Sequence, residues 1–329
     1  MRSKNKVGAV VALVVSAAAS AAANAAAPAT ITIPGERLFT ESFTSAKDGT
    51  VIVGSVMGRT IFRAKPGAET AEAWIQPGTE GLAGVFGVFA DDKSNTLWAC
   101  SGTFGGGRPP GGAADAPPPP PPPSALYAFD LKTGAHKGHY PFPTAGGFCN
   151  DIAVDKDGNA YASDTNNMQV VQLKKGAKEL VVWSADGAFG PKGGVLDGIA
   201  VLGDRVLTNT LGTSKIFATP IGKDGKAGMT VEVKLDTPVE RPDGMRSFGK
   251  NSLLVAEGGG GKLSKIVIDG DSGKRTVLKE GLTNGLVAVT VVGTTAYGLE
   301  SGMRMGPPGA GGAAPPKPST ATGVEVGKP

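Results

Sequence analysis

The sequence predicts an all-β fold, a six-bladed β-propeller built of four-stranded antiparallel blades. Three observations lead to this prediction. A pattern of strands and turns recurs at roughly 40 to 45 residues, which is typical of propeller blades. The apolar residues alternate with a period of two, and no stretch has the spacing of an amphipathic helix. The chain has 51 glycines in 329 residues, while 15 of its 25 prolines fall between Arg108 and Pro123 or after Met303.

Each repeat begins with a polar residue followed by a short apolar run. These starts are Glu41-Ser42-Phe43, Asn150-Asp151-Ile152, Asp197-Gly198-Ile199, Asp243-Gly244-Met245 and Asn284-Gly285-Leu286. The copies at 150, 197, 243 and 284 are 47, 46 and 41 residues apart, and a further copy, GVFGVFADD, fits between 41 and 150. Counting these starts gives six blades.

Three more strands complete each expected repeat. Second strands are VIVGS, AYASD, VLTNT, SLLVAE and AYGLES, and third strands are TIFRAK, ALYAFD, VVQLKK, KIFATPI and KLSKIVI. The polar outer strands are AEAWI, ELVVW, TVEVKL and RTVLKE. Because the sixth blade is incomplete within residues 284–302, we expect residues 30–39 and 320–327 to close it, which would also remove exposed strand edges.

Several segments fall outside the repeat, which occupies residues 30–302. Residues 1–27 have the charged start, apolar core and small-residue end of a secretory signal peptide, the alternative being an uncleaved anchor. Residues 103–123 hold seven consecutive prolines and are expected to be an exposed Gly/Pro-rich insertion in blade 2. Residues 303–319 are expected to be loose, with a closing strand in 320–329. The signal predicts a periplasmic or secreted protein with no membrane contact after cleavage.

The composition limits the partners of this chain. The net charge is +4, but Arg2, Lys4 and Lys6 supply three of these charges and the other cations are scattered among acids. We therefore expect no nucleic-acid partner, and a small molecule as substrate or ligand. In an oxidising compartment Cys100 and Cys149 could form a disulfide, the alternative being two small buried side chains on neighbouring strands.

The repeated polar residues predict a site in the central channel. The innermost strands of a propeller line its channel, so Glu41, Asp197 and Asp243 should converge there with Asn150. Further channel candidates are Asp151 and Asn284. Carboxylates brought together repel one another unless they are protonated or bind a cation. Oxygen ligands without His or Cys favour Ca²⁺, or Mg²⁺ or Mn²⁺, over Zn²⁺ or copper.

Other chemistries find little support in the sequence. The only two histidines, His136 and His139, are expected on the rim, so a catalytic histidine and a Ser-His-Asp triad are not expected. No GxSxG, HExxH or phosphate-loop motif occurs.

The segments around Glu41, GGFCNDIAVDKDGNAYASDT, Asp197-Gly198 and Pro242-Asp243-Gly244-Met245 resemble the senescence-marker-protein, gluconolactonase and luciferin-regenerating-enzyme family. The resemblance covers roughly residues 36–302. It implies a divalent cation held by Glu41, Asp197 and Asp243, with Asn150 near the substrate. This chain has Asp197 where the family has Asn, and Phe148 where the family has a substrate-contacting Arg.

The resemblance implies an exported, metal-dependent hydrolase of lactones or related esters. The cation would polarise the carbonyl and activate water, with Asp243 as the first candidate for general base. One alternative is a non-catalytic propeller that binds a ligand or partner through the same channel, which Phe148 favours. A minor alternative is a strictosidine-synthase-like enzyme without a metal.

Overall fold

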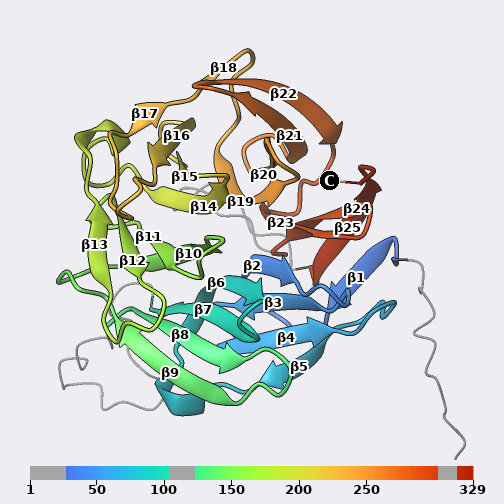
Figure 1. Cartoon of the computed structure of the whole chain (residues 1–329). Coiled ribbons are helices and arrows are strands. Elements are labelled where there is room, and N and C mark those ends of the chain that lie inside the picture. Colours follow the sequence, from blue (N-terminus) through green and yellow to red (C-terminus); the bar gives the residue numbers. More distant parts are fainter. Residues whose placement is uncertain (1–26, 104–122, 303–316, 329) are drawn as a thin grey trace, which may run out of the picture.

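Six sheets, antiparallel except for one short edge strand, surround a central axis in the computed structural model, which describes residues 27–103, 123–302 and 317–328. Viewed along the axis, the sheets follow one another around the ring in chain order (Figure 1). The all-β six-bladed propeller predicted from the repeats is therefore confirmed. The helical structure in the described residues consists of two three-residue 3₁₀ turns, Thr79–Gly81 and Gly187–Phe189.

The first three blades each take four consecutive strands. Blade 1 contains β2 (Thr40–Ser45), β3 (Val51–Ser55), β4 (Thr60–Ala64) and β5 (Glu72–Ile75). Blade 2 contains β6 (Gly84–Asp91), β7 (Thr96–Gly102), β8 (Ala125–Asp130) and β9 (His136–Pro141). Blade 3 contains β10 (Cys149–Val154), β11 (Ala160–Asp164), β12 (Gln169–Leu173) and β13 (Val181–Ser184).

The remaining blades include two departures from this simple order. Blade 4 contains β14 (Leu196–Leu202), β15 (Arg205–Thr210), β16 (Lys215–Pro220) and β17 (Val231–Glu232). Blade 5 contains β19 (Pro242–Phe248), β20 (Ser252–Glu257), β21 (Lys262–Asp269), β22 (Ser272–Lys279) and β18 (Lys234–Leu235). Blade 6 contains β23 (Leu286–Val292), β24 (Thr295–Glu300), β25 (Ser319–Glu325) and β1 (Thr30–Ile33).

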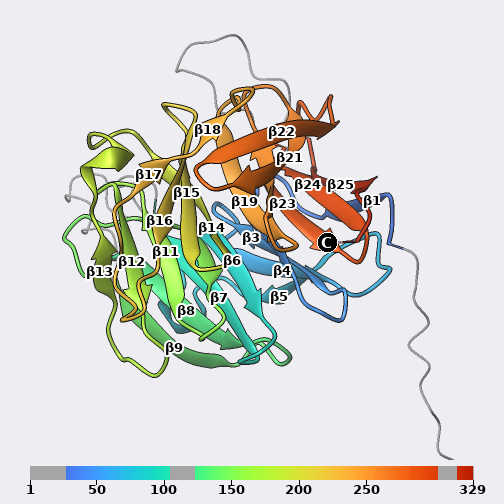
Figure 2. The ribbon, with the colours of Figure 1, turned by 45° about the horizontal axis from the view of Figure 1, so that its top comes forward.

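Blade 6 joins the two ends of the described chain. β1 pairs antiparallel with β25 from Thr30 opposite Thr322 to Ile33 opposite Ser319. Both views show the blue β1 beside β25 (Figures 1 and 2). The predicted closure by terminal strands is confirmed, with the pairing confined to the first part of residues 30–39 and beginning at Ser319.

One predicted outer strand was wrong in its extent. The segment TVEVKL is divided between two blades: β17 pairs with β16 of blade 4, whereas β18 runs parallel to β22 and extends blade 5. The division follows from Val233, whose N–H donates to the carbonyl of Ile216 in blade 4, and from Lys234, whose N–H donates to Asp271. The segment thus covers part of the outer edge of both blades.

The hydrophobic core lies between neighbouring blades. Apolar clusters occupy the interfaces between blades 1 and 2, 2 and 3, 3 and 4, 4 and 5, 5 and 6, and 6 and 1. At the interface that closes the ring, Phe43 of β2 meets Tyr297 of β24 edge to face at 6.4 Å between ring centroids. Because each inner strand is buried from both sides, its backbone is held firmly where the channel begins.

Three sequence predictions lie outside the described residues in whole or large part: the signal peptide at 1–27, the insertion at 103–123 and the loose segment at 303–319. Among the residues that are described, no helix has the length and apolar character needed to cross a membrane.

Candidate functional site

Every inner strand carries a β-bulge at the same level. The pairing with the second strand shifts between Thr40 and Ser42 in β2, and between Cys149 and Ile152 in β10, with equivalent shifts in the other four inner strands. A bulge adds one residue and redirects its side chain. We call the first residue of each bulge a member of the bulge ring, which consists of Glu41, Phe86, Asn150, Asp197, Asp243 and Val287.

The three carboxylates of the bulge ring influence one another across the channel. Burial and the charges of Asp197 and Asp151 raise the pKa of Glu41 to about 8. Burial and Asp151 raise the pKa of Asp197 to about 7, against the opposing effect of a hydrogen bond with Asn150. Burial, Asp197 and Glu41 raise the pKa of Asp243 well above its usual value. These effects require that side chains from blades 1, 4 and 5 face a common space.

One carboxylate oxygen facing this space has no hydrogen-bond partner. The Oε2 atom of Glu41 is buried and forms no hydrogen bond, an arrangement that costs free energy unless a proton or a cation compensates it. Across residues 27–103, 123–302 and 317–328, no three His, Cys, Asp or Glu side chains are gathered closely enough to hold a metal ion. Glu41, Asp197, Asp243 and Asn150 match a hard divalent cation in the chemistry of their oxygen ligands, but not in the spacing that their side chains have here.

Asn150 is fixed by its neighbours rather than free in the channel. It is 8% exposed, donates from Nδ2 to Thr165 Oγ1 at 3.1 Å, and lowers the pKa of Asp197. Thr165 in turn donates to the carbonyl of Leu196 at 2.7 Å. The third and fourth blades therefore present their polar residues as one connected unit.

Asp151 lies deeper and is neutralised by an arginine. Both carboxylate oxygens of Asp151 accept hydrogen bonds from Arg246, at 2.7 and 3.2 Å. Arg246 also donates to Ser42 Oγ and to the carbonyls of Phe43 and Val88. This guanidinium, 8% exposed, thus joins blades 1, 2, 3 and 5 below the bulge ring. The sequence interpretation gave Arg246 no role, although a single cation inside an apolar inner strand was the available signal.

Two positions of the bulge ring are apolar. Blade 2, for which the sequence offered no ring residue, contributes Phe86, and blade 6 contributes Val287. Asn284 lies three residues before Val287 in the turn that leads to β23, where its N–H donates to Glu300 Oε1 at 2.8 Å. Phe148 packs edge to face on Phe86, with ring centroids 4.6 Å apart.

Carboxylates at the ends of second strands hold the loops that enter the inner strands. Asp164 accepts the N–H of Phe148 at 2.9 Å, and Glu257 accepts the N–H of Glu240 at 2.7 Å. Glu257 is also paired with Arg275 through both oxygens, at 2.7 and 2.9 Å. These acids support the entrances to β10 and β19, and so they act on backbone geometry rather than as members of the bulge ring.

Cys100 and Cys149 form a disulfide that links β7 to β10, and both are fully buried. This agrees with the first of the two alternatives for these cysteines. His136 and His139 lie on β9, the outermost strand of blade 2, as the rim prediction required. They are therefore remote from the bulge ring.

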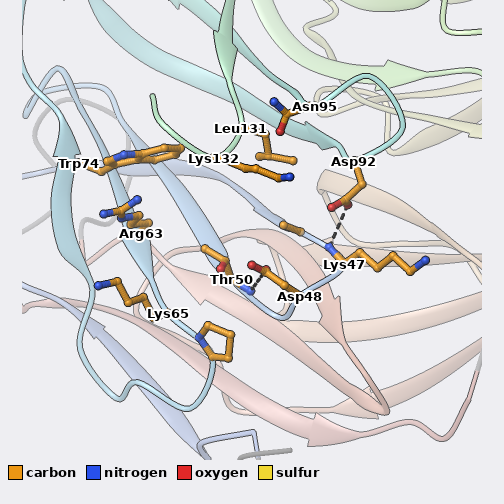
Figure 3. A pocket seen from close by; sticks show the side chains of 12 residues that line it. Lys47, Asp48, Thr50, Arg63, Lys65, Trp74, Asp92, Asn95, Leu131 and Lys132 are labelled. Atoms are coloured by element: carbon orange, nitrogen blue, oxygen red, sulfur yellow. Dashed lines mark hydrogen bonds between the residues drawn. The ribbon is translucent and has the colours of Figure 1, made fainter. Parts of the chain in front are cut away.

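A separate hollow lies near the opposite ends of blades 1 and 2 (Figure 3). Its volume is about 650 Å³, and its lining includes Lys47, Asp48, Arg63 and Trp74. The Arg63 guanidinium sits 4.8 Å from the centre of a Trp74 ring, and Asp92 accepts the N–H of Lys47 at 2.9 Å. None of the bulge-ring residues lines this hollow.

No family model and no curated protein matches the chain. Solved structures do match. A luciferin-regenerating enzyme has a TM-score of 0.60 at 11% identity, covering 91% of this chain and 98% of its own. A gluconolactonase from Xanthomonas campestris has a TM-score of 0.58 at 15% identity, with coverages of 90% and 89%. A calcium-binding protein, regucalcin, from Agrobacterium tumefaciens also has a TM-score of 0.58, at 12% identity, with coverages of 90% and 93%.

At such identities the comparisons establish the fold, and an activity has to be argued from the site. Virginiamycin B lyase from Staphylococcus aureus, with a different chemistry, matches at a TM-score of 0.54. The chain is a six-bladed propeller whose structural neighbours include gluconolactonase, luciferin-regenerating enzyme and regucalcin.

Proposed function

We propose that the protein is an exported, metal-dependent hydrolase that acts on lactones or related esters. The observation that carries this proposal is that burial, together with the charges of neighbouring acids, raises the pKa values of Glu41, Asp197 and Asp243, while Glu41 Oε2 has no hydrogen-bond partner. Asp197 is buried and Glu41 and Asp243 are half-buried; acids in such positions that repel one another are costly to maintain, and a divalent cation offsets that cost. Ca²⁺ is the first choice and Mg²⁺ or Mn²⁺ the next.

In this proposal Glu41, Asp197 and Asp243 hold the cation, which supplies Lewis-acid polarisation of the substrate carbonyl and lowers the pKa of a bound water. The amide of Asn150, fixed by Thr165, orients the substrate. Asp243 serves as general base: its Oδ1 accepts the N–H of Gly244 at 2.9 Å, which fixes the carboxylate and leaves Oδ2 as the proton acceptor. A bound cation would favour the ionised forms of Asp197 and Glu41, whose pKa values are raised in its absence.

The apolar side of the channel bears on the substrate. Phe148 and Phe86 pack edge to face, and Phe148 stands where the resembled family has an arginine that contacts the substrate. This favours neutral lactones or esters with an apolar portion over sugar acids. The same observation supports the second candidate function, a ligand-binding propeller that binds the cation and an apolar ligand without hydrolysing it.

The test is hydrolysis by the purified protein of a panel of aldonolactones and aliphatic lactones, with Ca²⁺ and with EDTA. The proposal expects turnover that EDTA abolishes, with greater activity toward aliphatic lactones. Asp243→Asn should lower kcat by about 10²- to 10⁴-fold, the usual contribution of a general base. Asp269→Asn, on the outer part of blade 5, is the matched control and should leave kcat unchanged. Tight Ca²⁺ binding without turnover would establish the ligand-binding alternative instead.

A further inference from the structure

One residue of each second strand lies opposite the bulge of its inner strand. We call these the bulge-facing residues: Gly54, Cys100, Ser163, Asn209, Ala256 and Leu299. They are equivalent by register, yet their chemistry divides them into two groups. Those of blades 1, 5 and 6 are glycine or apolar, whereas those of blades 2, 3 and 4 each form a specific link to the next blade.

Ser163 uses one hydroxyl for two bonds. Its Oγ accepts the N–H of Asp151 at 3.1 Å, which satisfies the bulge of its own blade, and donates to the carbonyl of Asp197 at 2.6 Å in the next blade. The side chain is fully buried. Ser163 therefore holds the backbone of Asp197, a candidate cation ligand. It makes no hydrogen bond to the Asp197 carboxylate itself.

Asn209 repeats this arrangement one blade further on. Its Oδ1 accepts the N–H of Gly198 at 3.2 Å, and its Nδ2 donates to the carbonyl of Asp243 at 2.6 Å. Asn209 is also fully buried. The two blades approach closely at this point, so that a Cβ on Gly198 would clash with the Asp243 carbonyl oxygen.

Cys100 makes the corresponding link in blade 2 by its disulfide to Cys149, the residue before Asn150. The three links are consecutive around the ring and end at or beside three consecutive polar members: Asn150, Asp197 and Asp243. The bulge-facing residues of blades 1 and 5 precede the apolar members Phe86 and Val287, and they are Gly54 and Ala256. Leu299 of blade 6 is also apolar, although it precedes Glu41. Polar or covalent links thus lead to three of the four polar members of the bulge ring, Asn150, Asp197 and Asp243.

We propose that Ser163 and Asn209 are positioning residues, which hold Asp197 and Asp243 in the backbone geometry that divalent-cation binding requires. This inference depends on the cation site of the proposed function. A fixed carbonyl limits the φ and ψ angles of its residue, and hence the direction in which the carboxylate leaves the backbone. Groups that orient metal ligands from behind typically account for 10- to 100-fold in metal affinity.

The experiment is calorimetric titration of Ca²⁺ into the purified, disulfide-bonded protein. Ser163→Ala and Asn209→Ala should each weaken the affinity by about 10- to 100-fold. Thr208→Val is the matched control, because Thr208 is 1% exposed, neighbours Asn209 on β15, and has an Oγ1 without a hydrogen-bond partner. It should bind Ca²⁺ as the wild type does. Ser163→Ala removes a single hydroxyl, so a folded variant remains if Asn209→Ala does not fold.

A purely structural role predicts a different result. In that case each variant would lose the same unfolding free energy in EDTA and in Ca²⁺, and its Kd would equal that of the wild type, which would overturn the inference. Positioning predicts a smaller gain of stability from Ca²⁺, by about 1.4 kcal/mol for each tenfold loss of affinity. A wild type that binds Ca²⁺ without hydrolysing lactones would refute the hydrolase and leave this inference standing, whereas a wild type that binds no Ca²⁺ would refute both.

Discussion

The buried Arg246 side chain makes a sharp prediction about stability. Its guanidinium bonds to both oxygens of Asp151, to Ser42 Oγ and to the carbonyls of Phe43, Val88 and Met245. Arg246→Met keeps much of the aliphatic stem and removes the charge. Asp151, 4% exposed, would then be a buried carboxylate without a counter-charge.

The size of the loss follows from this burial. Removing one partner of a buried ion pair costs about 3 to 5 kcal/mol, because the remaining charge is uncompensated. For a domain of this size, that loss lowers Tm by roughly 6 to 20 °C. Most of it should come from the stranded carboxylate, so Arg246→Met combined with Asp151→Asn should be more stable than Arg246→Met alone.

Equilibrium urea denaturation in EDTA measures these differences, provided that the transitions are two-state. The matched control is Arg205→Met, whose ion pair with Asp271 at 3.4 Å has one partner 65% exposed. Such a surface pair contributes at most about 1 kcal/mol. If Arg246→Met lost no more stability than Arg205→Met, or if the double variant were less stable than the single one, the assignment of Arg246 as the link between four blades would be wrong.

Two further predictions concern the pH dependence and the disulfide. Because folding raises the pKa of Asp197 to about 7 and of Glu41 to about 8, the cation-free folded state retains protons that the unfolded chain loses. Its unfolding free energy should therefore fall as the pH rises from about 4 to 8, and Ca²⁺ binding at pH 7 should release protons, as titration in buffers of different ionisation enthalpy would show. A flat stability profile in EDTA would contradict the buried-acid arrangement. Replacing Cys100 and Cys149 together by Ala should cost about 4 kcal/mol in the chain-entropy model, given their separation of 49 residues, and unchanged urea denaturation would refute this.

The sequence was sufficient to predict the propeller because its information is periodic. The starts at Asn150, Asp197 and Asp243 recur at blade spacing, and strands at equivalent positions of a closed ring must face the same axis. That these side chains form one site in the channel stays a prediction. The division of TVEVKL between blades 4 and 5 could not be predicted, because both halves alternate alike and only tertiary contacts decide which edge each one joins.

Which residue of each inner strand belongs to the candidate site depends on the pairing register of the strands, and the sequence alone does not reveal that register. A shift of one residue turns a side chain to the opposite face of a strand. Asn284 and Val287 illustrate this, since the polar residue resembled the other repeat starts while the bulge falls three residues later. Ser163 and Asn209 gave no signal at all, because their importance comes from the carbonyl groups of the neighbouring blade.

The pairing of β1 with β25 has a consequence for how the molecule is made. Until residues 319–325 have left the ribosome, β25 is missing from blade 6 and the ring is open. The strand edges of β1 and β24 that pair with β25 then have no partner. A protein truncated before residue 319 would expose the edges of β1 and β24. Each exposed edge could pair with a strand of another copy. The ring can therefore close only after residues 319–325 have been synthesised.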